Sequence, residues 1–105
     1  MAKVIWTTPA LNDLREIIEF IAQDSSVYAE RVGMRIVSAP RFLETFPHSG
    51  RIVPEFSDES IRELIYGSYR IVYKIYKSDC FITAIIHASR DFIKHVQPGE
   101  WDVPS

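Results

Sequence analysis

The sequence has few of the residues from which cross-linked or metal-bound folds are built. Only one of its 105 residues is a cysteine, Cys80, which excludes an internal disulfide and favours a reducing compartment. The three histidines are scattered and lack the spacing of zinc ligands. The four glycines stand alone, so the chain has no glycine-rich loop to cradle phosphate. We therefore expect neither a metal nor a cofactor.

Long apolar runs are missing too. None approaches the roughly 18–20 residues that a membrane-spanning helix requires. Residues 1–6 contain no extended apolar core leading to a small-residue cleavage site, so we expect no secretory signal. Together with the single cysteine, these features predict a cytoplasmic protein with no membrane partner.

The charge is small. There are 12 Lys and Arg against 14 Asp and Glu, a net charge of −2, which disfavours a protein that coats nucleic acid by charge alone. This total conceals a division, because residues 60–97 carry six basic and three acidic side chains. An apolar content of 47% in 105 residues predicts one domain with a substantial core. We place that domain at residues 1–97 and a C-terminal tail at 98–105.

Helical periodicity dominates the first half of the chain. After a short β-prone segment at residues 3–7, Thr8 and Pro9 provide a helix start, because threonine caps and proline suits the first turn. Residues 24–26 break the pattern and offer a second cap, and Pro40 should kink the second helix. Two helices packed as an antiparallel hairpin are therefore predicted. The apolar residues at helical spacing are Leu11, Leu14, Ile18, Ile21, Ala29, Val32, Ile36, Leu43 and Phe46.

After the turn-rich residues 47–60 the period changes to two. Residues 61–66, 69–77 and 80–87 are expected as strands, joined by turns at Gly67-Ser68 and Ser78-Asp79. The last of them is almost entirely apolar, so we expect it to be central in the sheet. Residues 88–96 are either a short helix or an irregular segment. The order is β-α-α-β-β-β, which predicts an α+β fold with a helical hairpin packed on a mostly antiparallel sheet.

Charges of alternating sign in residues 51–63 admit two interpretations. They could form an internal ion-pair network that fixes this loop. Alternatively, Arg51 and Arg62 could belong to an anion-binding site.

Three further side chains stand out near the C-terminus. His87 lies three residues before Arg90, so it is either an acid or base beside an anion-holding arginine or a structural histidine at a strand end. Trp101, in a polar tail, should dock on the domain or on a partner. Cys80 has no basic neighbour in sequence, so an activated thiolate is not expected.

Several short motifs follow one another at a defined spacing between about residues 4 and 92. They are Trp6-Thr7, Asp13-Leu14, Ile21-Ala22, Phe46-Pro47, Ser49-Gly50-Arg51, Val53-Pro54-Glu55, Ile61-Arg62-Glu63-Leu64, Tyr69-Arg70-Ile71-Val72-Tyr73 and His87-Ala88-Ser89-Arg90-Asp91-Phe92. In this order they resemble the ParE branch of the RelE/ParE superfamily, the toxins of type II toxin–antitoxin pairs, also known from plasmid stabilisation.

The resemblance implies one of two activities. RelE-like members cut mRNA on the ribosome, in which case Arg62, Arg70, His87 and Arg90 would be catalytic. ParE-like members poison DNA gyrase without catalysis of their own, in which case Arg51, Arg62, Arg70 and Arg90 would contact the target or bind an anion. An inactive member that keeps the toxin fold for binding is a third possibility.

Two departures from the RelE-like pattern favour the gyrase interpretation. Glu63 stands in a strand that is lysine-rich in many of the nucleases, and residues 98–102 are acidic where other nucleases keep a His or Tyr.

The resemblance also implies a small antitoxin whose C-terminal segment wraps the toxin. We expect an apolar groove for it on the helical hairpin, lined by Leu14, Ile18, Ile21 and Leu43. The sequence leaves the oligomeric state open.

Overall fold

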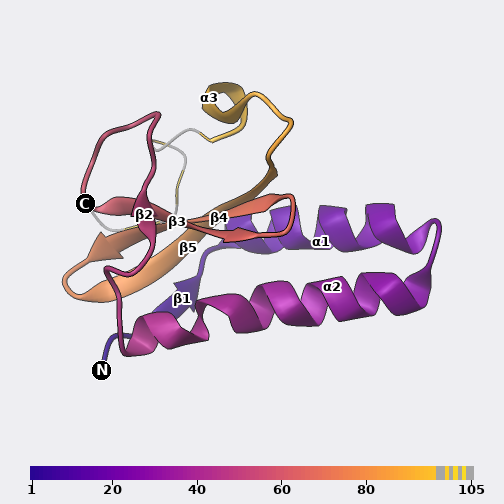
Figure 1. Cartoon of the computed structure of the whole chain (residues 1–105), viewed down its shortest axis with the longest axis horizontal. Helices are drawn as coiled ribbons and strands as arrows, with labels where there is room; N and C mark the ends of the chain where they lie inside the picture. The colour runs from indigo at the N-terminus through magenta and orange to yellow at the C-terminus, as the bar shows by residue number, and fades with distance from the viewer. Residues whose placement is uncertain (97–98, 100, 102, 104–105) are drawn as a thin grey trace.

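A computed structural model gives the fold and describes residues 1–96, 99, 101 and 103. The chain forms one mixed sheet with a pair of long helices on one face (Figure 1). The elements in chain order are β1 (Val4–Trp6), α1 (Thr8–Ala22), α2 (Ser26–Ser38), the 3-10 helix η1 (Ala39–Glu44), β2 (Arg51–Ile52), β3 (Ile61–Tyr66), β4 (Tyr69–Tyr76), β5 (Asp79–His87) and α3 (Phe92–His95). The α+β class and the predicted element order are confirmed.

The sheet has the strand order β1-β5-β4-β3-β2. Only β1 runs parallel to its neighbour, with Val4 opposite Cys80, and the other pairs are antiparallel. The apolar strand β5 is interior, as its lack of a polar face predicts, although β4 holds the central position. The two-residue strand β2 lies in the segment predicted as a loop, because two residues are too few to show a period of two.

Side-chain caps start both long helices. The hydroxyl of Thr7, rather than Thr8, accepts the N–H of Ala10 and caps α1. Ser25 caps α2 through the N–H of Tyr28, as predicted. At Pro40 the chain does not simply kink: α2 ends at Ser38 and continues as η1, because proline has no N–H for the next α-helical bond.

The main core lies between the helices and the sheet. Leu14, Ile36 and Leu43 meet Ile71 and Ile82 there, while Trp6, Ile18 and Ile21 pack around them half-buried. Two predicted core positions are wrong. Leu11 is half exposed and Phe46 is mostly exposed, because the first lies on the outer edge of α1 and the second follows η1, where the α-helical phase is already lost.

A second, smaller core covers the opposite face of the sheet, on the side of α3 in Figure 1. Val72 and Ile86 form its floor, and Phe92 of α3 packs on them. Trp101 packs edge-on against Phe56, with ring centres 6.2 Å apart, so this tryptophan docks on its own domain. Most of the tail predicted at residues 98–105 lies outside the described residues, and the boundary at residue 97 stays a prediction.

Two tight turns join the last three strands. Gly67 has a φ of 55°, as expected for glycine in the first position of a two-residue hairpin turn. The next turn is centred on Lys77 and Ser78, both with positive φ, one residue earlier than predicted. Among the residues that the structure describes, no helix is long and apolar enough to cross a membrane.

Candidate functional site

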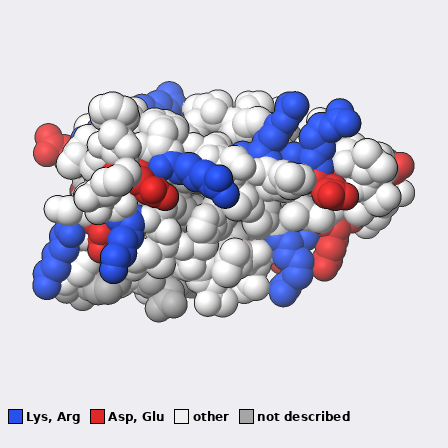
Figure 2. Space-filling model, turned by 90° about the horizontal axis from the view of Figure 1, so that it is seen from below, with Lys and Arg blue, Asp and Glu red and all other residues white. Residues whose placement is uncertain are grey.

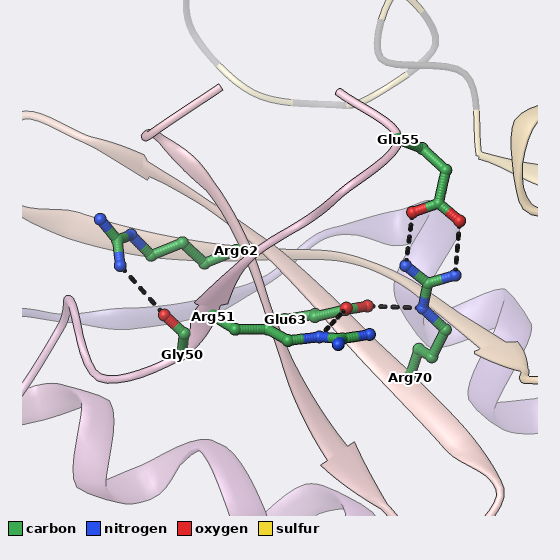
Figure 3. Close-up of polar contacts among 6 residues, drawn as sticks. All are labelled: Gly50, Arg51, Glu55, Arg62, Glu63 and Arg70. Carbon is green, nitrogen blue, oxygen red and sulfur yellow. Dashed lines mark hydrogen bonds and ion pairs between the residues drawn. The ribbon is translucent and has the colours of Figure 1, made fainter. Parts of the chain in front are cut away.

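Four charged side chains form one cluster on the face of the sheet opposite the hairpin (Figure 3). Glu63 of β3 accepts a hydrogen bond from Arg51 Nε on one carboxylate oxygen and from Arg70 Nε on the other, each at 2.5 Å. The terminal nitrogens of Arg70 bind both oxygens of Glu55, at 2.9 and 2.7 Å. Three arginine–carboxylate pairs thus tie β2, β3 and β4 to the loop of residues 53–60.

Register explains why these residues meet. Arg51 lies directly opposite Glu63 across β2 and β3, and Glu63 lies opposite Val72 in β4, two positions from Arg70. Side chains at such positions share one face of a sheet. Of the two sequence interpretations of residues 51–63, the ion-pair network is present in part: Arg51 pairs with Glu63, whereas Glu55 pairs with Arg70 outside this segment. Anion binding by Arg51 and Arg62 stays a prediction.

The two carboxylates of the cluster have different surroundings. The side chain of Glu63 is fully buried between its two arginines, whereas that of Glu55 is 29% exposed. The hydrogen bonds from Arg70 lower the pKa of the Glu55 carboxyl, and the same bonds raise the pKa of the Arg70 guanidinium. Arg70 also lies over the ring of Phe92, with the guanidinium carbon 3.9 Å from the ring centre, so the guanidinium packs on the second core.

Arg62 points elsewhere. Its guanidinium donates to the backbone carbonyls of His48, Gly50 and Glu59, at about the same distance in each case (2.9–3.0 Å). Since Arg62 alternates with Glu63 along β3, it leaves the strand on the other face. It closes the loop that precedes β3 and is not part of the cluster.

His87 and Arg90 lie at the far end of β5. His87 Nδ1 is 2.7 Å from Ser89 Oγ, and its ring meets Tyr69 edge-on across the strand pair. Tyr69 packs against the main core, whereas its neighbour Arg70 lies over the second core, so His87 and Arg70 face opposite sides of the sheet. The four residues expected at a scissile phosphate in a nuclease therefore do not converge in this structure.

A cleft of about 410 Å³ opens beside His87, between α1, the end of β5 and α3. At its base Asp13 accepts the N–H of Ile85 at 2.9 Å and lies 3.4 Å from Nε2 of His95. Burial raises the pKa of the Asp13 carboxyl, against the lowering effect of these two contacts. Sequence reasoning missed this role, because Asp13 falls off the apolar stripe of α1 and its partners lie more than 70 residues away. Arg90 lines the rim of the same cleft.

The hairpin carries an apolar groove of about 630 Å³ between α1 and α2. Figure 2 views the molecule from the side on which α2 lies, where separate Lys and Arg side chains stand among wide uncharged areas. Half-buried Ile18 lines the groove, but Leu14 and Leu43 are buried in the main core and offer no surface to a partner. Ile21 is half-buried against that core. The groove-lining residues that were not predicted are the apolar or small Ala22, Ala29, Gly33, Met34 and Val37 and the polar or charged Ser26, Glu30, Ser38 and Arg41.

Cys80 is buried, and burial raises the pKa of its thiol to about 11, so it is no thiolate at neutral pH. Within the described residues, no group of three His, Cys, Asp or Glu side chains is placed to hold a metal ion.

Comparison with known proteins identifies the family. The model of the ParE toxin of the type II toxin–antitoxin system, parDE, matches residues 4–92. The protein named Toxin RelE2 of Caulobacter vibrioides is 35% identical over 91 residues, which cover 86% of this chain and 99% of the relative. A solved structure of the chromosomal ParDE TA system from P. aeruginosa shares the fold, with a TM-score of 0.71 at 18% identity over 85% of this chain and 98% of that one. The chain therefore belongs to the ParE toxin family within the RelE/ParE superfamily and is a toxin of a type II toxin–antitoxin system.

Proposed function

We propose that this toxin acts in the cytoplasm on DNA gyrase and that a cognate ParD-like antitoxin neutralises it. The observation that carries the choice of target is the placement of the arginines. Arg70 and Arg62 leave the sheet on opposite faces, and His87 lies on the face opposite Arg70. A nuclease needs its base, its acid and its cations around one phosphate, and this arrangement does not supply them.

Purified toxin added to gyrase and relaxed plasmid tests the target. We expect loss of supercoiling or accumulation of cleaved DNA as toxin is added, and recovery when the antitoxin is added first. Normal supercoiling at a stoichiometric excess of folded toxin that arrests growth in cells would overturn the proposal.

The name of the relative, Toxin RelE2, favours a second candidate, a ribosome-dependent mRNA endoribonuclease. Toe-printing on translating ribosomes distinguishes this candidate from a gyrase inhibitor. A nuclease would cut mRNA in the ribosomal A site, and the amount of cleavage would fall in the Arg70→Ala variant. Induction of the toxin alone separates both active candidates from an inactive member that only binds, because the inactive member leaves growth unchanged.

The antitoxin would lie on the hairpin. The groove between α1 and α2 is lined mainly by apolar side chains with Glu30 and Arg41 among them, which suits an amphipathic helix that folds on binding. Of the residues predicted from the sequence, Ile18 and Ile21 remain candidates for this contact. Leu14 and Leu43 would support it from the core beneath.

A further inference from the structure

We propose that Arg51 and Arg70 form an oxyanion site that Glu55 of the same chain occupies, so that an external oxyanion binds only by displacing Glu55. The ligand class is a group with two free oxygens, a phosphate or a carboxylate. The inference rests on the geometry of the cluster and holds whichever cellular target the toxin has.

The contact between Arg70 and Glu55 has the form of ligand recognition. Both terminal nitrogens of the guanidinium meet both carboxylate oxygens, at 2.9 and 2.7 Å (Figure 3). This parallel pair of hydrogen bonds is the arrangement by which arginine binds carboxylate and phosphate groups of ligands. Glu55 thus stands where such a ligand would stand.

Glu63 and Glu55 play different parts in the cluster. Glu63 lies on the interior strand β3, is fully buried, and is held by Arg51 and Arg70 together. Glu55 lies on the loop of residues 53–60, is partly exposed, and among the described side chains is hydrogen-bonded to Arg70. Glu63 therefore fixes the arginines, and Glu55 is the group that can leave.

Arg51 has hydrogen-bond donors left for a ligand. Only its Nε is engaged in the described part of the chain, and its side chain is 58% exposed. It binds the second oxygen of the same Glu63 carboxylate that Arg70 binds, so the two guanidinium groups are close neighbours. With Glu55 displaced, two positive charges would face one fixed negative charge, and the site would have a net positive charge for an incoming anion.

The arrangement also explains why binding should be weak while Glu55 is in place. A tethered group competes at an effective concentration of about millimolar or more, so a single free anion at lower concentration does not displace it. Arg70 is already ordered by Glu63 and by the ring of Phe92, so binding a ligand costs little conformational entropy at this side chain. Removing the charge of Glu55 should therefore expose a prepared site.

The test is a titration of ¹⁵N-labelled toxin with inorganic phosphate at constant ionic strength, followed by NMR. We compare wild type with Glu55→Gln, which keeps the shape of the side chain and loses its charge. Glu59→Gln is the matched control, because it removes one charge from the same loop, and the only contact of Glu59 that the structure gives is through its backbone carbonyl. We expect phosphate affinity in Glu55→Gln to exceed that of wild type and of Glu59→Gln by about fivefold or more.

Two further arms complete the test. Adding Arg51→Gln to Glu55→Gln should return the affinity to the wild-type level, with amide shifts confirming that the fold is kept. A titration with acetate in place of phosphate identifies the chemical class of the ligand. Equal binding of the two anions points to a carboxylate ligand, and selective binding of phosphate points to a phosphate ligand. Equal phosphate affinity in wild type, Glu55→Gln and Glu59→Gln would overturn the proposal, as would an affinity in the double variant that remains high.

Discussion

The hydroxyl of Tyr73 accepts a hydrogen bond from the backbone N–H of Gly50 at 3.0 Å. The same hydroxyl donates to the carbonyl of Pro47 at 2.8 Å, so a fully buried side chain in the central strand holds the start of the loop that carries the charged cluster. Glycine is required at this point. A Cβ at residue 50 would lie 2.6 Å from the Tyr73 hydroxyl and 2.8 Å from the carbonyl oxygen of Glu63.

Gly50→Ala should therefore destabilise the toxin. The added methyl group meets backbone as well as side chain and forces both to shift, at a cost of about 1–3 kcal/mol in the free energy of unfolding. Urea denaturation measures the loss. Gly99→Ala is the control, because apart from its chain neighbours no atom of the described residues lies within 4 Å of the added Cβ there, and equal stability of the two variants would contradict the account.

Glu63→Gln should be among the costly single changes in the charged cluster. It removes the charge of a fully buried carboxylate that balances Arg51 and Arg70, and breaking a buried pair in this way costs about 3 kcal/mol. Chemical denaturation compares it with Glu59→Gln, whose side chain has no ion pair among the described contacts. A loss no larger than that of the control would mean that the cluster contributes no stability.

The difference in stability between wild type and Glu55→Gln should depend on pH. Arg70 lowers the pKa of the Glu55 carboxyl from its usual 4.5, so this group stabilises the fold above pH 4.5 and loses that contribution as the pH falls through the lowered value. The difference in unfolding free energy between wild type and Glu55→Gln should be about 1 kcal/mol at neutral pH and should vanish in acid. Thermal unfolding from pH 2 to 7 measures it, and a difference that does not change with pH would refute the assignment.

The contribution of Asp13 to stability should depend on pH in the opposite direction. Burial raises the pKa of its carboxyl above 3.8, so the protonated form is the more favourable one in the fold, and its contribution is lost as the pH rises through the raised value. Asp13→Asn, which still accepts the Ile85 N–H, should be as stable as wild type at pH 7. Asp13→Ala leaves that buried N–H unpaired and should cost about 1–3 kcal/mol. Equal stability of the two variants in urea would contradict the role of this hydrogen bond.

Met34→Glu tests the proposed antitoxin groove. Met34 lines the groove and is 65% exposed, so a carboxylate there should weaken antitoxin binding and leave the fold intact. Val27→Glu is the matched control, because Val27 is exposed on the same helix and does not line the groove. Isothermal titration with the antitoxin measures both, and equal affinities would place the contact elsewhere.

Much of the fold could be predicted from local signals. The strands around Gly67 alternate between faces, and Ser25 caps a helix as its position in the sequence suggests. The features that were predicted wrongly are those that the local sequence does not indicate. The strand β2 is too short to show a period, and Phe46 keeps the helical spacing of the sequence although the chain has left the α-helix at Ser38.

The candidate site was predicted less completely. The alternating charges pointed to Arg51 and Arg62 together, yet only Arg51 joins the cluster. Arg51 pairs with Glu63, whereas Arg62 is the neighbour of Glu63 along β3, and strand alternation sends it to the opposite face. Glu55 was part of the alternating run, but its pairing with Arg70 depends on how the loop of residues 53–60 folds back over the sheet.

The sequence by itself determined the element order, the α+β class and the resemblance to the toxin family, since periodicity, capping residues and motif spacing are local properties of the chain. Tertiary structure alone decided which charges meet. Arg70 reaches Glu55 and Glu63 from 15 and 7 residues away, and Asp13 reaches His95 across most of the chain. Such pairings depend on strand register and on the return of a loop, which together bring distant side chains within hydrogen-bonding distance.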